Sequence, residues 1–209
     1  MESAKQFPVV TVLGPRQSGK TTLCRTTFPS HKYFSFEDPD VRRRAIDDPR
    51  SFLAEIEDFA ILDEIQRIPE LLSYLQGVID SKKVSGRYIL TRSHQPMLSS
   101  AVSQSLAGRT AILELWTFSF HEIRKFESGL SLEDVIIKGR YPRVYDKNVN
   151  SGSFYNSYIQ TYLERDVHSI INLKVIRSFE RFLSVIATRV GQLINYESIS
   201  NKWEFHRLR

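Results

Sequence analysis

The segment Gly14-Pro-Arg-Gln-Ser-Gly-Lys-Thr21 is the most specific indication of the fold of this 209-residue chain. It fits the pattern G-x-x-x-x-G-K-[ST] at every fixed position. An apolar run over residues 7–13 precedes it, and residues 20–27 have a helical pattern. The glycines let the backbone turn tightly around a phosphate, and the start of the following helix adds a partial positive charge. The stretch therefore predicts a phosphate-binding loop between a strand and a helix.

The loop and the first turn of its helix form the predicted nucleotide-binding set. Its members are Gly14, Pro15, Arg16, Gln17, Ser18, Gly19, Lys20, Thr21 and Thr22. We expect Lys20 to reach the β- and γ-phosphates of a nucleotide, and the Thr21 hydroxyl to ligate Mg²⁺.

Four more short apolar runs indicate further strands. They cover residues 33–36, 59–62, 88–90 and 111–116. Helical patterns cover residues 20–27, 41–57 with a break at Pro49, 69–80 and 96–106. Strand and helix alternate five times, which predicts an α/β fold with helices on both faces of a parallel sheet. With the phosphate-binding loop, the expected fold class is a P-loop NTPase three-layer sandwich with a five-stranded parallel sheet.

A second motif, Phe59-Ala-Ile-Leu-Asp-Glu64, ends an apolar strand in two carboxylates. We expect Asp63 to hold Mg²⁺, directly or through water, and Glu64 to act as the general base on the attacking water. The two carboxylates together favour hydrolysis over phosphoryl transfer, so a nucleotide kinase is the less favoured interpretation.

Polar residues elsewhere complete the predicted catalytic set. Thr91 and Ser93 follow the run 88–90, and we expect a polar side chain at such a strand end to contact the γ-phosphate and the attacking water. Arg109, directly before the run 111–116, and Arg143 are two candidates for an arginine finger, acting in the same subunit or from a neighbour.

After Trp116 the strand patterns stop and helical patterns begin. They cover residues 118–126, a short helix opened by a capping box from Ser131 to Asp134, 154–171 and 176–190. The chain therefore has an α/β core of about 118 residues and a helical region, with the expected linker at residues 146–153.

Composition excludes several protein classes. With 41% hydrophobic and 25% charged residues, wholesale disorder is excluded. No apolar run approaches the ~20 residues of a membrane-spanning helix, so we expect no membrane partner. The single cysteine, Cys24, cannot form an internal disulfide, so the cytoplasm is the expected compartment. The net charge of +5 permits DNA binding without arguing for it.

Taken together, these segments resemble a family of prokaryotic AAA-type ATPases that carry a nuclease-like C-terminal domain. The resemblance runs from about Phe7 to Ser200. It rests on GPRQSGKTTL, YFSFEDPDVRRRAIDDPRSFL, FAILDEIQRIPELL, YILTRSHQ, SLAGRTAILEL, YPRVYD and YIQTYLERDV. It implies a sheet in the order 5-1-4-3-2 and ATP with Mg²⁺ as ligand. The ATPase roles fall on Lys20, Thr21, Asp63 and Glu64. Arg109 matches the finger position, which implies a homo-oligomer with ATP between its subunits.

The resemblance also implies a domain plan. Residues 1–118 are expected to form the ATPase core, 119–190 a helical lid or linker, and 191–209 an incomplete winged-helix-like segment. Because the last nine residues do not resemble the family, we expect a truncated product.

Two residues depart from the family pattern. Arg92 stands where members have glycine, and its side chain is expected to crowd the γ-phosphate. Arg140 also replaces a glycine, and a positive φ there would strain it. Three functions therefore stay open: an active Mg²⁺-dependent ATPase, a nucleotide-binding switch with little hydrolysis, and an inactive remnant.

Overall fold

The computed structural model describes residues 2–56, 59–82, 84–93, 106–147, 149–162, 176–193, 195–197 and 199. The chain divides into two compact units, Met1–Asn148 and Val149–Arg209. The first unit holds the sheet and every predicted site residue, and the second holds two of the helices described below.

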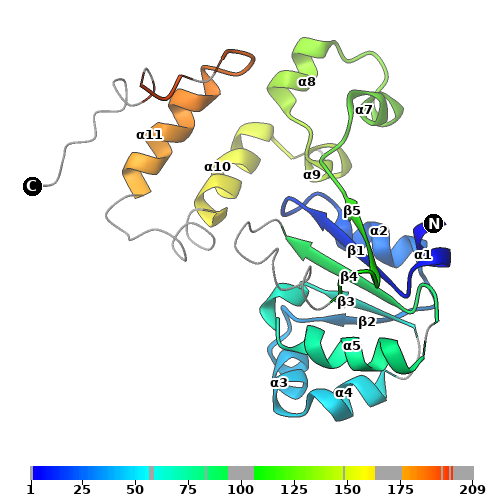
Figure 1. The fold of residues 1–209 in the computed structure, drawn as a ribbon. Coiled ribbons are helices and arrows are strands. Elements are labelled where there is room, and N and C mark those ends of the chain that lie inside the picture. The colour runs from blue at the N-terminus through cyan, green and yellow to red at the C-terminus, as the bar shows by residue number, and fades with distance from the viewer. Residues whose placement is uncertain are drawn as a thin grey trace, which may run out of the picture. The chain divides into compact units, whose positions relative to one another are not determined.

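Within the described residues, the first unit is built on a five-stranded parallel sheet (Figure 1). Its strands are β1 (Val9–Gly14), β2 (Lys32–Ser35), β3 (Ala60–Asp63), β4 (Tyr88–Ser93) and β5 (Thr110–Glu114). Their order is β2-β3-β4-β1-β5, which confirms both the five predicted strands and the order that the family resemblance implies.

Helices cover both faces of this sheet. The helices of the core are α1 (Glu2–Gln6), α2 (Lys20–Thr27), α3 (Pro39–Asp47), α4 (Pro49–Glu55) and α5 (Leu71–Ser81), with a 3-10 turn η1 (Ile65–Arg67) after β3. On one face, alternate strand residues such as Val10, Ile61 and Ile89 pack with Cys24 of α2. On the other, residues such as Leu62 and Leu90 join the larger core with α3, α4 and α5.

The helical pattern over residues 41–57 breaks where the sequence predicts it. Pro49 opens α4, because proline suits the first turn of a helix but not its interior. Asp48 ends α3 and caps α4, and its carboxylate accepts a hydrogen bond of 3.0 Å from the Ser51 N–H.

Three short helices complete the first unit: α7 (Phe120–Phe126), α8 (Leu132–Lys138) and α9 (Pro142–Asp146). The capping box from Ser131 to Asp134 forms as predicted, and a second one joins Ser119 and Glu122 at α7. Gly139 takes the positive φ of 77°, and Arg140 is not among the positive-φ residues. The condition for strain at Arg140, a positive φ, is therefore not met.

The second unit contains α10 (Ser151–Tyr162) and α11 (Ile176–Ala187). The prediction starts the first of these at Phe154, its first apolar periodic residue. It begins at Ser151 because the Asn150 side chain caps it, accepting a hydrogen bond of 3.0 Å from the Ser153 N–H. The expected helix over residues 96–106, the continuation to 171 and most of the winged-helix-like segment lie outside the described residues.

No helix within the described residues is long and apolar enough to cross a membrane.

Candidate functional site

The predicted loop leaves the carboxyl end of β1 and turns into α2, as its glycines require. Gly19 caps α2 with φ at 95°, and Gln17 is also in the left-handed region at φ 59°. Gly14 lies so close to Leu115, the residue after β5, that an added Cβ would be 2.1 Å from the Leu115 carbonyl oxygen. These positions force a tight turn at the start of the helix, the geometry that an anion-binding loop needs.

Lys20 lies inside this turn and is 5% exposed. Its Nζ donates hydrogen bonds to the carbonyl oxygens of Gly14 at 3.1 Å and Pro15 at 2.7 Å. Burial lowers the pKa of the ammonium, and the nearby carboxylates of Glu64 and Asp63 oppose that shift. The loop carbonyls thus hold the ammonium, which has no ion-pair partner at salt-bridge distance in the described part of the chain.

Ser18 lies in the same loop and is 4% exposed. Its hydroxyl has no hydrogen-bond partner among the described residues. A buried hydroxyl without a partner is costly, and a phosphate oxygen at the loop would satisfy it.

Asp63 ends β3 and accepts hydrogen bonds from three hydroxyls. Thr21 Oγ1 lies 3.0 Å from Oδ1 and 3.1 Å from Oδ2, and the Tyr33 hydroxyl donates to Oδ2 at 2.8 Å. The Thr91 hydroxyl donates to Oδ1. These bonds join the first turn of α2 to the carboxyl ends of β3 and β4 and to β2.

Glu64 follows directly and has a φ of 58°, unusual for a residue with a side chain. Its carboxylate accepts hydrogen bonds from the Ser93 hydroxyl, at 3.0 and 3.3 Å, and from the Gln66 side chain. Its backbone N–H donates to Thr91 Oγ1 at 3.1 Å. The carboxylate is therefore oriented on several sides beside Asp63.

The alternation of side chains along β4 explains why Thr91 and Ser93 reach these carboxylates. Residues two apart in a strand share a face, so both follow Ile89 onto the α2 face. Arg92 falls between them and follows Leu90 onto the opposite face, where it is buried. The expectation that the Arg92 side chain crowds the γ-phosphate is therefore wrong.

Arg109 is not brought to this site. It directly precedes β5, whose first residue pairs with Val9 at the amino end of β1. Five residues of strand separate that end from Gly14, roughly 16 Å at the usual rise. There the Arg109 guanidinium makes a two-point ion pair with the Asp80 carboxylate of α5, at 2.7 and 2.9 Å. Arg109 therefore does not reach the site of its own subunit as an arginine finger. Its action at the site of a neighbouring subunit stays a prediction.

The remaining predicted residues lie around the loop. Arg16 is half-buried, and its charge lowers the pKa of Lys20. Thr22 is exposed on α2, and Arg143 is exposed on α9. Pro142 directly precedes Arg143 in α9, and its Cγ lies 3.9 Å from where a Cβ at Gly19 would be. The segment that carries Arg143 thus lies close to the loop.

Sequence reasoning missed Tyr33 and Gln66. Burial, and next the hydrogen bond to Asp63, raise the pKa of Tyr33 to about 12, so its hydroxyl stays a donor at neutral pH. Only the pairing of β2 with β3 brings Tyr33 to Asp63, because Tyr33 lies two residues before Ser35, which pairs with Asp63 in the sheet. Gln66 reaches Glu64 through the turn η1, which the apolar pattern does not reveal.

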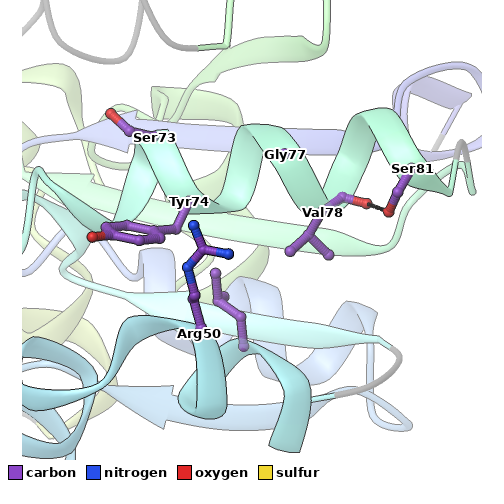
Figure 2. Close-up of a pocket in the computed structure, with 7 residues that line it drawn as sticks. Arg50, Ser73, Tyr74, Gly77, Val78 and Ser81 are labelled. Atoms are coloured by element: carbon purple, nitrogen blue, oxygen red, sulfur yellow. Dashed lines mark hydrogen bonds between the residues drawn. The ribbon is translucent and has the colours of Figure 1, made fainter.

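A cavity of about 620 Å³ lies elsewhere, between α4 and α5 (Figure 2). It is lined by Arg50, Leu53, Ser73, Tyr74, Gly77, Val78 and Ser81. These helices pack on the face opposite α2, and no predicted site residue lines the cavity.

The residues present fit a nucleotide with its metal. The close approach at Gly14, the left-handed Gly19 and the unpartnered Ser18 hydroxyl suit a phosphate, which offers several acceptor oxygens. The Thr21 hydroxyl and the Asp63 carboxylate, already in contact, are the hard oxygen donors that Mg²⁺ prefers.

A parallel sheet with this strand order, and with such a loop between β1 and α2, defines the P-loop NTPase class of fold. A family model described as an AAA domain matches residues 6–124. That match covers more than half of the chain, so the chain belongs to the AAA domain family. A second model, described as a domain of unknown function (DUF8612), matches residues 129–207. The predicted nuclease-like continuation and truncation stay predictions.

Two curated relatives match most of the chain. They are the uncharacterised proteins Mb2031c of Mycobacterium bovis and Rv2008c of Mycobacterium tuberculosis, each 32% identical over 194 residues. Each match covers 90% of this chain, and the chain spans 42% of the length of both relatives.

Among solved structures, two similarities have a TM-score of 0.31. One is to a signal transduction ATPase with a tetratricopeptide repeat sensor from Pyrococcus horikoshii, at 17% identity, covering 92% of this chain and 34% of that one. The other is to shikimate kinase from Acinetobacter baumannii, at 15% identity, covering 79% and 98%.

The close approach at Gly14 makes a stability prediction. Gly14→Ala places a methyl group against the Leu115 carbonyl, and we expect a loss of about 1–3 kcal/mol in the free energy of unfolding. Gly77→Ala is the matched control, because a Cβ there meets nothing within 4 Å in the middle of α5. It should add about 0.5–1 kcal/mol. Urea unfolding measures both, and equal effects of the two substitutions would contradict the loop geometry.

Proposed function

We propose that this chain binds ATP with Mg²⁺ at the loop from Gly14 to Thr21 and hydrolyses it to ADP and phosphate. One observation carries the proposal: Thr21, Asp63, Thr91, Glu64 and Ser93 form one connected hydrogen-bond network beside the buried Lys20. Such a network supplies a phosphate-binding cation, two oxygen donors for a metal and an oriented carboxylate.

Each residue of the site has a separate proposed role in ATP hydrolysis. The loop N–H groups and the Lys20 ammonium bind phosphate oxygens, and the Thr21 hydroxyl and Asp63 carboxylate hold Mg²⁺. When bound, Mg²⁺ neutralises charge on the phosphate oxygens. Glu64 accepts a proton from the attacking water, and Ser93 holds its carboxylate in position. Because Glu64 adjoins Asp63, water is the expected acceptor of the phosphoryl group rather than a second substrate.

The role of Glu64 can be separated from nucleotide binding. We expect Glu64→Gln to keep the ATP dissociation constant within about twofold and to lower phosphate release by a factor of ~10²–10⁴, the usual contribution of a general base. Titration calorimetry measures the binding, and a phosphate-release assay measures the turnover.

Glu133→Gln is the matched control, because Glu133 is an exposed carboxylate on α8. It should leave both quantities unchanged. Turnover that survives in Glu64→Gln would place the base on another residue.

A nucleotide-dependent switch with slow hydrolysis is the second candidate, and the position of Arg109 favours it for an isolated subunit. The finger candidate is ion-paired with Asp80 at the amino end of the sheet, far from Lys20. A single subunit thus lacks the Arg109 guanidinium at its own site. We therefore propose that hydrolysis speeds up in a homo-oligomer, where Arg109 comes from the neighbouring subunit.

A concentration series and mixtures of wild-type and Arg109→Ala subunits test that proposal. Turnover per subunit should rise with protein concentration, by a factor of ~10³ or more for an arginine finger, and Arg109→Ala should remove the rise. Arg109→Ala subunits should also inhibit wild-type subunits in mixtures. Arg43→Ala, at an exposed position of α3, is the control that should not inhibit. Turnover that does not change with concentration would exclude a finger acting between subunits.

A further inference from the structure

Tyr33 brings an additional hydroxyl to the predicted metal site. It belongs to the edge strand β2, where it pairs with Ile61, and Ser35 pairs with Asp63. The alternation of side chains places Tyr33 on the same face of the sheet as Asp63. Its hydroxyl reaches along the strand and donates to Asp63 Oδ2 at 2.8 Å.

The Tyr33 ring is also fixed against the helix that begins at the loop. The guanidinium carbon of Arg25, on α2, lies 4.8 Å from the ring centroid, which is within cation–π distance. The ring therefore lies between β2 and α2, and 37% of Tyr33 is exposed. A fixed ring gives its hydroxyl a defined position beside the carboxylate.

The hydrogen bonds on Asp63 divide between its two oxygens. Oδ1 accepts from Thr91, Oδ2 accepts from Tyr33, and Thr21 Oγ1 lies about equally far from both. Thr21 is the hydroxyl that a metal would recruit as a ligand. Tyr33 and Thr91 are then the two donors that keep the carboxylate plane in place, one on each oxygen.

We infer that Tyr33 is a positioning residue for magnesium: its hydroxyl orients the Asp63 carboxylate and so sets how strongly Mg²⁺ increases the affinity for ATP. The inference rests on the proposed ATP site. Groups that orient metal ligands usually change metal affinity by about 10- to 100-fold when removed.

Tyr33→Phe tests this inference because it removes the hydroxyl and keeps the ring under Arg25. Calorimetry gives the ATP dissociation constant in Mg²⁺ and in EDTA, and their ratio is the gain that Mg²⁺ supplies. We expect Tyr33→Phe to reduce the gain about 10-fold and to leave the affinity in EDTA unchanged.

The matched control is Tyr74→Phe on α5. Tyr74 is 40% exposed and also has an arginine, Arg50, over its ring at 5.9 Å, but it lies beside the cavity on the other face of the sheet. It should keep the full gain. Tyr33→Leu removes the same hydroxyl with a different shape and serves as the test if the phenylalanine variant does not fold.

Two results would overturn the inference while the proposed function stands. One is an unchanged gain in the Tyr33 variants. The other is an equal loss of affinity in Mg²⁺ and in EDTA, which indicates a general loosening of the site. Wild-type protein that binds no ATP in either condition would instead overturn the proposed function, and the inference with it.

Discussion

The contact between the Thr21 hydroxyl and the Asp63 carboxylate, at 3.0 Å, connects the parts on which the site depends. Thr21 lies in the first turn of α2, directly after the loop, and Asp63 lies at the carboxyl end of β3. Because β4 and β2 flank β3, hydroxyls from both neighbouring strands reach the same carboxylate. Together, the hydrogen bonds at Asp63 join α2, which follows the loop, to the strands β2, β3 and β4.

The parallel sheet makes this convergence possible. The carboxyl ends of its strands lie at the same end of the sheet, so Thr91 of β4 and Thr21, in the helix after the loop, both donate hydrogen bonds to Asp63 of β3. The period of two along each strand then decides which residues face the loop and which face the opposite core. For this reason Arg92, which lies between Thr91 and Ser93, does not enter the site. The same edge does not receive Arg109, which precedes its strand instead of following it.

Much of this could be predicted from the sequence because the signals are local. The glycine pattern, the apolar runs and the break at Pro49 each depend on residues within a few positions of one another, and the structure confirms them. The contacts at Asp63 and Glu64 are harder to predict from the sequence. Tyr33 reaches Asp63 only through the pairing of β2 with β3, and Arg109 reaches Asp80 across 29 positions. Neither long-range contact leaves a periodic pattern, and the Asn150 cap was missed because it precedes the first apolar residue of its helix.

A nucleotide site at the loop is tested most directly by the unfolding midpoint of the chain with and without ATP and Mg²⁺. A ligand at about 100 times its dissociation constant stabilises the native state by ~2.7 kcal/mol, which raises the midpoint by several degrees for a chain of this size. We expect that rise in the wild type and in Lys5→Ala, an exposed lysine of α1, and no rise in Lys20→Ala. The absence of a rise in the wild type, or an equal rise in Lys20→Ala, would contradict a nucleotide site at this loop.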